Sequence, residues 1–198
     1  MEQFKLFDDG EHLLLPEHLM EYRPGFFGKM ESERYLKFFL ETVSWQQTKV
    51  MMYDKEVLTP RLCAWFGDRP IRQDDTRPPI PWTDELRAIK MKVEEHTGII
   101  FNGVLLNYYR DGSDSVAWHS DKDTITGLKT EIASVSLGQP RNFDFRNKDN
   151  HRQQYSLELG NGSLLLMKGD LQKFWEHRIA KSAKPMKARI NLTFRKVA

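Results

Sequence analysis

The sequence predicts a mainly β fold, an antiparallel sandwich or jelly roll, with helices flanking it on the N-terminal side. Seven short segments after residue 98 show alternating or short apolar runs, as β-strands do. Turn signals rich in glycine, asparagine and proline separate these segments. Strands that follow one another this closely pair antiparallel, whereas an α/β chain would alternate them with helices.

Two helices are expected before the strands. Ser32 predicts the N-cap of a helix that runs to about Thr42, and the apolar face of this helix would be Tyr35, Leu36, Phe39 and Leu40. Thr83 predicts the N-cap of a second helix, which Gly98 would end. Between them, residues 67–82 are dense in proline and charge, which is typical of a long exposed loop. The expected strands are 98–109, 131–138, 141–146, 154–159, 163–168, 174–180 and 189–197.

Composition places few limits on function. The length of 198 residues fits a single domain, and no apolar run is long enough to cross a membrane. The acidic first 15 residues do not resemble a secretory signal, and Cys63 is the single cysteine, so we expect a reducing, cytoplasmic location, or a nuclear one in a eukaryote. Residues 168–198 hold nine basic against two acidic side chains, which favours contact with phosphates or simply a solvated basic surface.

A candidate metal centre lies in the segment Trp118-His119-Ser120-Asp121. His119 and Asp121 are two residues apart and would point to the same side of an extended chain. His177, on a predicted strand 58 residues after His119, would be the third ligand. Two histidines and one carboxylate form the facial triad that suits iron(II), although zinc accepts the same ligand types.

The last strand favours iron over structural zinc. Arg189, Asn191, Thr193 and Arg195 alternate, so all four would lie on one face, with an apolar set on the other. Two inward arginines are costly to bury without anions, and a dicarboxylate such as 2-oxoglutarate would pair with both. The alternative is a basic stripe that faces solvent.

Several segments together resemble the AlkB family of Fe(II)/2-oxoglutarate dioxygenases. These segments are PRLCAWFGD (60–68), TGIIFNGVLLNYYRDGSDSVAWHSDKD (97–123), IASVSLG (132–138), GSLLLMKG (162–169), WEHRI (175–179) and RINLTFR (189–195). The resemblance implies one domain over 1–198. Residues 98–198 would form a double-stranded β-helix catalytic core, and residues 1–97 an N-terminal extension with the nucleotide-recognition region.

The resemblance also implies roles for individual residues. His119, Asp121 and His177 would bind Fe(II), and O2 would react at that metal. Arg189 would hold the distal carboxylate of 2-oxoglutarate and Arg195 the carboxylate beside its keto group. Asn107, Tyr109 and Asn191 would hydrogen-bond the cosubstrate, and Asp123 would lie near the exocyclic group of a bound base.

The implied reaction is the oxidative demethylation of N-alkylated bases in DNA or RNA, which repairs alkylation damage and releases succinate, CO2 and an aldehyde. The target base would be flipped out or single-stranded. The expected partner is nucleic acid, with no membrane, and the protein is expected to be a monomer. Two alternatives are a hydroxylase of the same class that acts on a protein side chain or small molecule, and a binding module with a structural metal.

The chain departs from the family where relatives stack the flipped base on aromatic side chains. Ile71, Arg72 and Gln73 stand at that place. Arg72 could stack its guanidinium plane instead, or Trp65 could move in, although a core role for Trp65 is the alternative. Arg61 is predicted either to approach the nucleic-acid backbone or to be a surface arginine.

Overall fold

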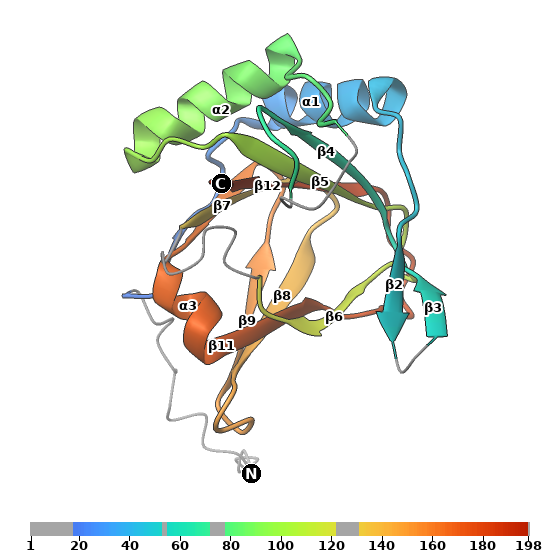
Figure 1. Ribbon diagram of the computed structural model, residues 1–198, viewed down its shortest axis with the longest axis vertical. Coiled ribbons are helices and arrows are strands. Elements are labelled where there is room, and N and C mark those ends of the chain that lie inside the picture. Colours follow the sequence, from blue (N-terminus) through green and yellow to red (C-terminus); the bar gives the residue numbers. More distant parts are fainter. Residues whose placement is uncertain (1–17, 53–54, 72–77, 122–130, 198) are drawn as a thin grey trace, which may run out of the picture.

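Two antiparallel β-sheets face one another in the computed structural model, which describes residues 18–52, 55–71, 78–121 and 131–197 (Figure 1). The major sheet has the order β1 (Met20–Arg23), β10 (Ser163–Met167), β7 (Ile132–Gly138), β12 (Arg189–Arg195), β5 (Gly103–Tyr109) and β4 (Leu62–Gly67). The minor sheet has the order β6 (Val116–His119), β11 (Trp175–Ile179), β8 (Arg141–Asn147) and β9 (Gln154–Leu159). From β5 to β12 the chain crosses repeatedly between the sheets, which makes the double-stranded β-helix that was predicted.

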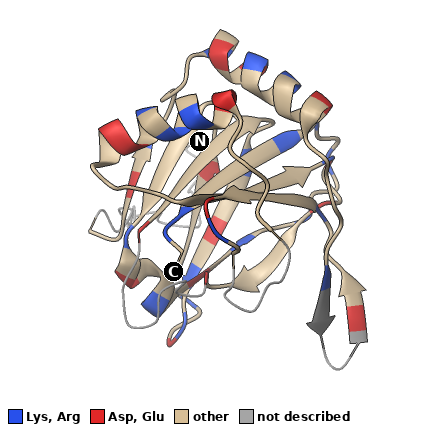
Figure 2. Cartoon of the chain, turned by 45° about the horizontal axis from the view of Figure 1, so that its top comes forward, with Lys and Arg blue, Asp and Glu red and all other residues tan. Residues whose placement is uncertain are grey.

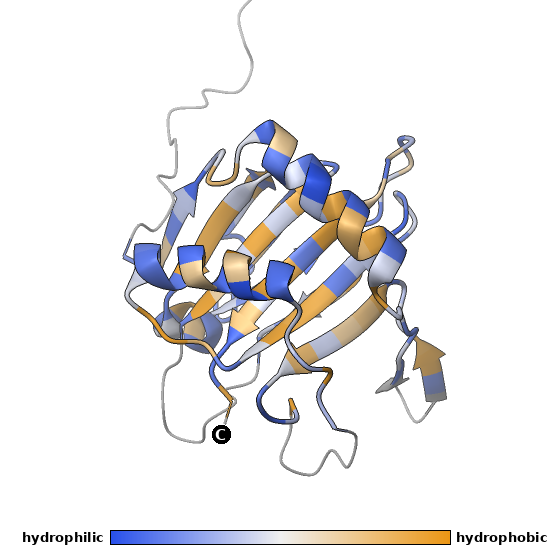
Figure 3. Cartoon of the chain, turned by 90° about the horizontal axis from the view of Figure 1, so that it is seen from above, coloured by the Kyte–Doolittle hydropathy of each residue, from blue (hydrophilic) through white to orange (hydrophobic). Residues whose placement is uncertain are grey.

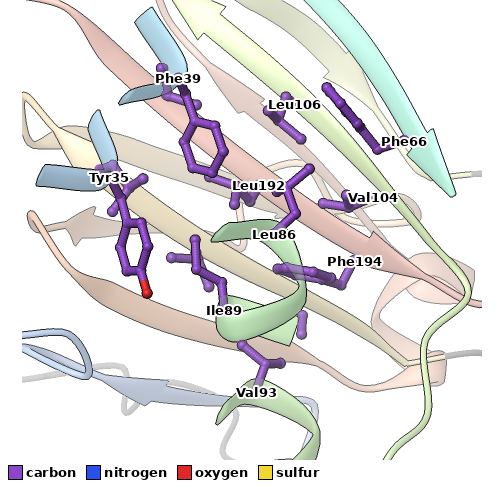
Figure 4. Packing of buried hydrophobic residues seen from close by; sticks show 14 of the residues in the cluster. Tyr35, Phe39, Phe66, Leu86, Ile89, Val93, Val104, Leu106, Leu192 and Phe194 are labelled. Atoms are coloured by element: carbon purple, nitrogen blue, oxygen red, sulfur yellow. The ribbon is translucent and has the colours of Figure 1, made fainter. Parts of the chain in front are cut away.

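Two helices, α1 (Lys29–Thr42) and α2 (Asp84–Thr97), cover the outer face of the major sheet (Figures 1 and 3). Lysine or arginine and acidic residues are interspersed along both helices (Figure 2). The contact with the sheet is apolar and fully buried, as Figure 4 shows for Phe39 of α1, Ile89 of α2, and Leu192 and Phe194 of β12. This layer occupies the outer face of β12 and β5, so the inner face is left for polar side chains.

The limits of α2 agree with the prediction, whereas the start of α1 does not. The Thr83 hydroxyl accepts from the Leu86 N–H at 3.2 Å, and Gly98 closes the helix with φ +70°. Helix α1 instead begins at Lys29, with Gly28 as N-cap. Ser32 is therefore inside the helix, and its hydroxyl donates back to the carbonyl of Gly28 at 2.9 Å, the common bond of a mid-helix serine.

The seven predicted strands are present, with shifted ends, as β5, β7, β8, β9, β10, β11 and β12. The elements that were not predicted are β1, β4, β6, β2 (Lys49–Met52), β3 (Lys55–Leu58) and helix α3 (Gly169–Phe174). Strands β1 and β4, from the first 97 residues, extend the major sheet by pairing with β10 and β5. The strands β2 and β3 form a hairpin beside the core (Figure 1). Helix α3 lies between the strands expected at 163–168 and 174–180 and shares only Phe174 with the second of them. Within the described residues, no helix is long and apolar enough to span a membrane.

The predicted loop 67–82 is described in part, because residues 72–77 lie outside the described ranges. Next to them, Ile80 forms a parallel bridge with Phe66 of β4. Trp82 is buried and stacks on Phe194, with ring centroids 6.5 Å apart. The end of this segment is therefore part of the core and not an exposed loop.

Candidate active site

The two sheets bring the three predicted metal ligands together. His119 is the last residue of β6 and lies opposite His177 of β11 in the strand register, with ring centroids 4.3 Å apart. Asp121 follows two residues later. One ligand atom from each of the three residues lies within 4.8 Å of the others. The geometry suits a single cation bound by two imidazoles and one carboxylate.

The two imidazoles are oriented by different contacts. The Nδ1 atom of His119 lies 2.8 Å from the Ala117 carbonyl, which leaves Nε2 for the metal. Among the described residues His177 Nδ1 has no hydrogen-bond partner, and its ring stacks on Phe143 instead, at a centroid distance of 4.9 Å. Packing therefore fixes the ring of His177, and its Nε2 lies 3.6 Å from Asp121 Oδ2.

Protonation states at the site match those of metal ligands. Burial lowers the pKa of His177 to about 3, although Asp121 opposes this effect. Burial alone would raise the pKa of Asp121, but Arg195 and the two histidines overcome it and hold this pKa at about 2. At neutral pH the carboxylate is ionised and the imidazole of His177 is neutral, so their 3.6 Å contact is not an ion pair. Both are the forms that bind a metal.

Arg195 joins the last strand to the metal site. Its Nη2 donates to Asp121 Oδ1 at 2.6 Å, and the side chain is only 12% exposed. Its Nε is buried and lacks a hydrogen-bond partner in the part of the chain that the structure describes. This guanidinium thus neutralises the aspartate and still has a donor to offer an anion beside the metal.

Arg189, at the other end of the same face, is buried with donors to spare. The residue is 1% exposed, and its Nη2 donates to Ser136 Oγ at 3.0 Å. Its Nε and Nη1 have no hydrogen-bond partner among the described residues, and no described carboxylate pairs with it. Burial, and secondarily Arg141, lowers its pKa to about 10. A buried cation in this state calls for an anionic ligand.

The remaining predicted cosubstrate residues lie on the same inner face. Asn107 is paired with Asn191 in the β5–β12 register, and Tyr109 with Arg189, whose guanidinium carbon is 5.1 Å from the tyrosine ring. Asn191 donates to Ser134 Oγ at 2.7 Å. The opposite set on β12, Ile190, Leu192 and Phe194, packs in the helix-side core at 0% exposure. The predicted division of β12 into a polar and an apolar face is therefore present.

Two of the predicted substrate residues are described, and both lie beside this face. The Nε of Arg61 donates to Asn107 Oδ1 at 2.8 Å, so Arg61 is tied to a predicted cosubstrate residue and is not a free surface arginine. The ring of Trp65 covers Gly103, where a Cβ would lie 2.3 Å from its atoms. Trp65 Nε1 donates to the Arg69 carbonyl at 2.8 Å. The other two, Asp123 and Arg72, lie outside the described residues.

Several residues at the site were not predicted. Ser134 and Ser136 alternate within the apolar strand β7, and that alternation is a signal that could have found them. Phe143, which stacks on His177, has the same alternation in β8. Gln172, whose side chain accepts from the Asp121 N–H, has no signal in the local sequence. Gln172 lies next to Asp121 only because the folded chain brings α3 beside the residues that follow β6.

A double-stranded β-helix with an inward triad of two histidines and an aspartate, next to a pair of arginines, is the architecture of an iron oxygenase that uses a dicarboxylate cosubstrate. Residues 20–195 match the model of the 2OG-Fe(II) oxygenase superfamily, and the chain belongs to that superfamily. Within it, the chain is a member of the AlkB family, as its sequence predicts.

Named relatives support this placement. The chain is 37% identical over 184 residues to alpha-ketoglutarate-dependent dioxygenase alkB homolog 3 of Homo sapiens, an alignment that covers 88% of this chain and 64% of that protein. It is 34% identical over 184 residues to the DNA oxidative demethylase ALKBH2 of Homo sapiens, with 86% and 70% covered. The chain thus spans less than two thirds of the length of the alkB homolog 3 proteins that it matches.

A solved structure shows the same fold. The structure of OsALKBH1 superposes with a TM-score of 0.66 and covers 89% of this chain and 97% of that one. The sequence identity is 16%, so this likeness bears on the fold alone.

Proposed function

We propose that the protein catalyses the Fe(II)- and 2-oxoglutarate-dependent oxidative demethylation of N-alkylated bases in DNA or RNA. One observation carries the cosubstrate part of the proposal. Arg189 is buried with two unpartnered guanidinium nitrogens, on the same strand face as Arg195, which contacts the metal-ligand candidate Asp121. The base substrate is supported by relatives that are named as DNA oxidative demethylases.

The inner face fits 2-oxoglutarate by charge and by unpartnered donors. Arg189 would hold the distal carboxylate, which would satisfy its Nε and Nη1 and neutralise a buried cation. Arg195, at the other end of β12, would use its Nε on the carboxylate beside the keto group. Asn107, Tyr109 and Asn191 would complete the polar wall between the two arginines.

Fe(II), 2-oxoglutarate and O2 would supply the oxidation, in which 2-oxoglutarate loses CO2 to become succinate. One atom of O2 would go to succinate and the other to the N-alkyl carbon, and the hydroxylated product would then lose an aldehyde. His119, Asp121 and His177 would hold the metal, with Asp121 ionised and His177 neutral. Arg195 would keep Asp121 ionised and would orient the cosubstrate. The two sheets would exclude bulk water from the reacting atoms.

The base would enter beside β4, at the edge of the major sheet. Trp65 is half-buried and lies on the same face of β4 as Cys63, the residue that is paired with Asn107 in the β4–β5 register. Arg61 donates a hydrogen bond to Asn107, and a phosphate or a base of the substrate would replace Asn107 as its acceptor. We propose Arg61, Trp65, Arg72 and Asp123 as substrate contacts, with Arg72 in place of the aromatic platform of relatives.

We also propose that the enzyme acts as a monomer in the cytoplasm or, in a eukaryote, the nucleus.

A substrate panel tests the proposal. The protein is incubated with Fe(II), 2-oxoglutarate, ascorbate and oligonucleotides that carry 1-methyladenine or 3-methylcytosine, as single and double strands of DNA and of RNA. Succinate and the mass of each oligonucleotide are measured, and we expect demethylated product on at least one of them. Succinate without demethylation would point to a protein or small-molecule substrate. The His119→Ala variant should be inactive, and full activity of this variant would contradict the metal assignment.

A further inference from the structure

Asp121 is held from two sides by different elements of the fold. Arg195 of β12 contacts its carboxylate, and its backbone N–H donates to Gln172 Oε1 at 2.9 Å. Gln172 belongs to α3, and α3 leads directly into β11, the strand that carries His177. One side chain therefore connects the element of the third metal ligand to the backbone of the second.

The amide of Gln172 is placed for this contact. The residue is only 6% exposed, and its Nε2 donates to Met167 Sδ at 3.6 Å. If the amide were rotated by 180°, its NH2 group would face the N–H of Asp121, and two donors would meet without an acceptor. The orientation with Oε1 toward Asp121 is therefore fixed.

A second bond strengthens the connection. The hydroxyl of Ser120 donates at 2.8 Å to the carbonyl of Trp175, the residue between α3 and the rest of β11. Residues 120 and 121 are thus tied to the α3–β11 segment by two hydrogen bonds, and His119 is tied to it by its register with His177.

We infer that Gln172 is a positioning residue for the metal centre, which sets the backbone of Asp121 relative to His177. Loss of its acceptor would release the backbone of Asp121 from α3, so Arg195 alone would hold the carboxylate, and no longer at the distance that the two histidines require. Loss of a residue that holds a metal ligand in place typically lowers metal affinity by about 10- to 100-fold. This inference rests on the metal centre of the proposed function and not on its nucleic-acid substrate.

Metal affinity of the whole chain is the test, with Mn(II) as the probe in the absence of nucleic acid. Gln172→Met keeps the length and burial of the side chain but removes the acceptor, and we expect the Kd for Mn(II) to rise about tenfold. Gln172→Glu restores an acceptor and should bring the Kd back toward that of the unsubstituted protein. Ser120→Ala, which removes the second bond, should raise the Kd in the same direction and serves if Gln172→Met does not fold.

A matched control separates positioning from general loosening. Gln154→Met makes the same chemical change at an exposed position of β9, where the side chain donates to the His151 carbonyl. This variant should bind Mn(II) as the unsubstituted protein does. A lower melting temperature of metal-free Gln172→Met with an unchanged Kd would overturn the inference. If the unsubstituted protein itself fails to bind Mn(II), the proposed metal centre falls together with it.

Discussion

The guanidinium of Arg195 donates a 2.6 Å hydrogen bond to the carboxylate of Asp121, and both side chains are almost buried. This contact joins the predicted cosubstrate strand to the predicted metal loop. It also explains how a buried aspartate remains ionised, with a pKa of about 2, before any metal binds. The arginine thus acts on the metal centre as well as on the cosubstrate, and the first prediction follows from this double role.

Replacement of Arg195 should damage both stability and cosubstrate binding. In Arg195→Met the carboxylate of Asp121 stays buried without its cation, which costs about 3–5 kcal/mol in comparable pairs. We expect the metal-free variant to unfold at lower urea concentration and its KM for 2-oxoglutarate to rise about 100-fold. Unchanged urea unfolding would contradict the pairing. Arg195→Lys should recover part of the stability but not the KM, because lysine lacks the planar fork.

Replacement of Arg189 should have the opposite effect on stability. This cation has no carboxylate partner among the described residues, so its removal relieves a desolvation cost. Metal-free Arg189→Met should be as stable as the unsubstituted protein or more stable, by up to about 3 kcal/mol in urea unfolding, while the KM for 2-oxoglutarate rises about 100-fold. A destabilised variant with normal KM would show that Arg189 has a structural role and does not bind the cosubstrate.

Acid should destabilise the metal-free protein through His177. Its pKa in the folded protein, about 3, is below the ordinary value of 6.5. Between these two pH values the imidazole is protonated in the unfolded chain but stays neutral in the folded protein. The contribution of His177 to the free energy of unfolding has its full value above pH 6.5. It falls as the pH drops below that value, by at most about 1.4 kcal/mol per pH unit. Urea unfolding between pH 7 and 5 should show this extra slope in the unsubstituted protein relative to His177→Asn. Parallel slopes would mean that His177 is not buried in its neutral form.

Gly162 is a position where only glycine fits. Its φ is +74°, and a Cβ there would lie 2.3 Å from the Phe27 carbonyl oxygen and 2.4 Å from Ser32 Oγ, at the start of α1. We expect Gly162→Ala to lose about 2–4 kcal/mol in urea unfolding, from backbone strain and overpacking together. Gly98→Ala is the matched control, because φ is +70° but no atom lies within 4 Å of the added carbon. It should lose only about 1–2 kcal/mol, and equal losses would argue against the clash.

The sequence predicted those parts of the site that depend on local periodicity. The alternation from Arg189 to Arg195 placed these residues on one face, and the spacing of His119 and Asp121 placed them together, because side-chain direction in an extended chain has a period of two. His177 was predicted as the third ligand from its place on an expected strand, but its position opposite His119 could not be predicted, since the register of β6 with β11 is set by distant packing.

Other features could not be predicted because they depend on long-range contacts. Strands β1 and β4 are short, and their places in the major sheet come from β10 and β5. Gln172 reaches Asp121 only once α3 has folded against the metal loop. Ser32 has the residue type of an N-cap, but the bond between Phe27 N and Gly162 O holds the chain so that α1 begins earlier.

The most direct test of the proposed activity is the ratio of products in a single reaction. The unsubstituted protein, given Fe(II), 2-oxoglutarate, O2 and a single-stranded oligonucleotide with one 1-methyladenine, should form one formaldehyde and one unmodified adenine for each succinate. Base demethylation would be contradicted if succinate formed at the same rate with and without the methylated base, and if no formaldehyde formed in this reaction or in the same reaction with 3-methylcytosine.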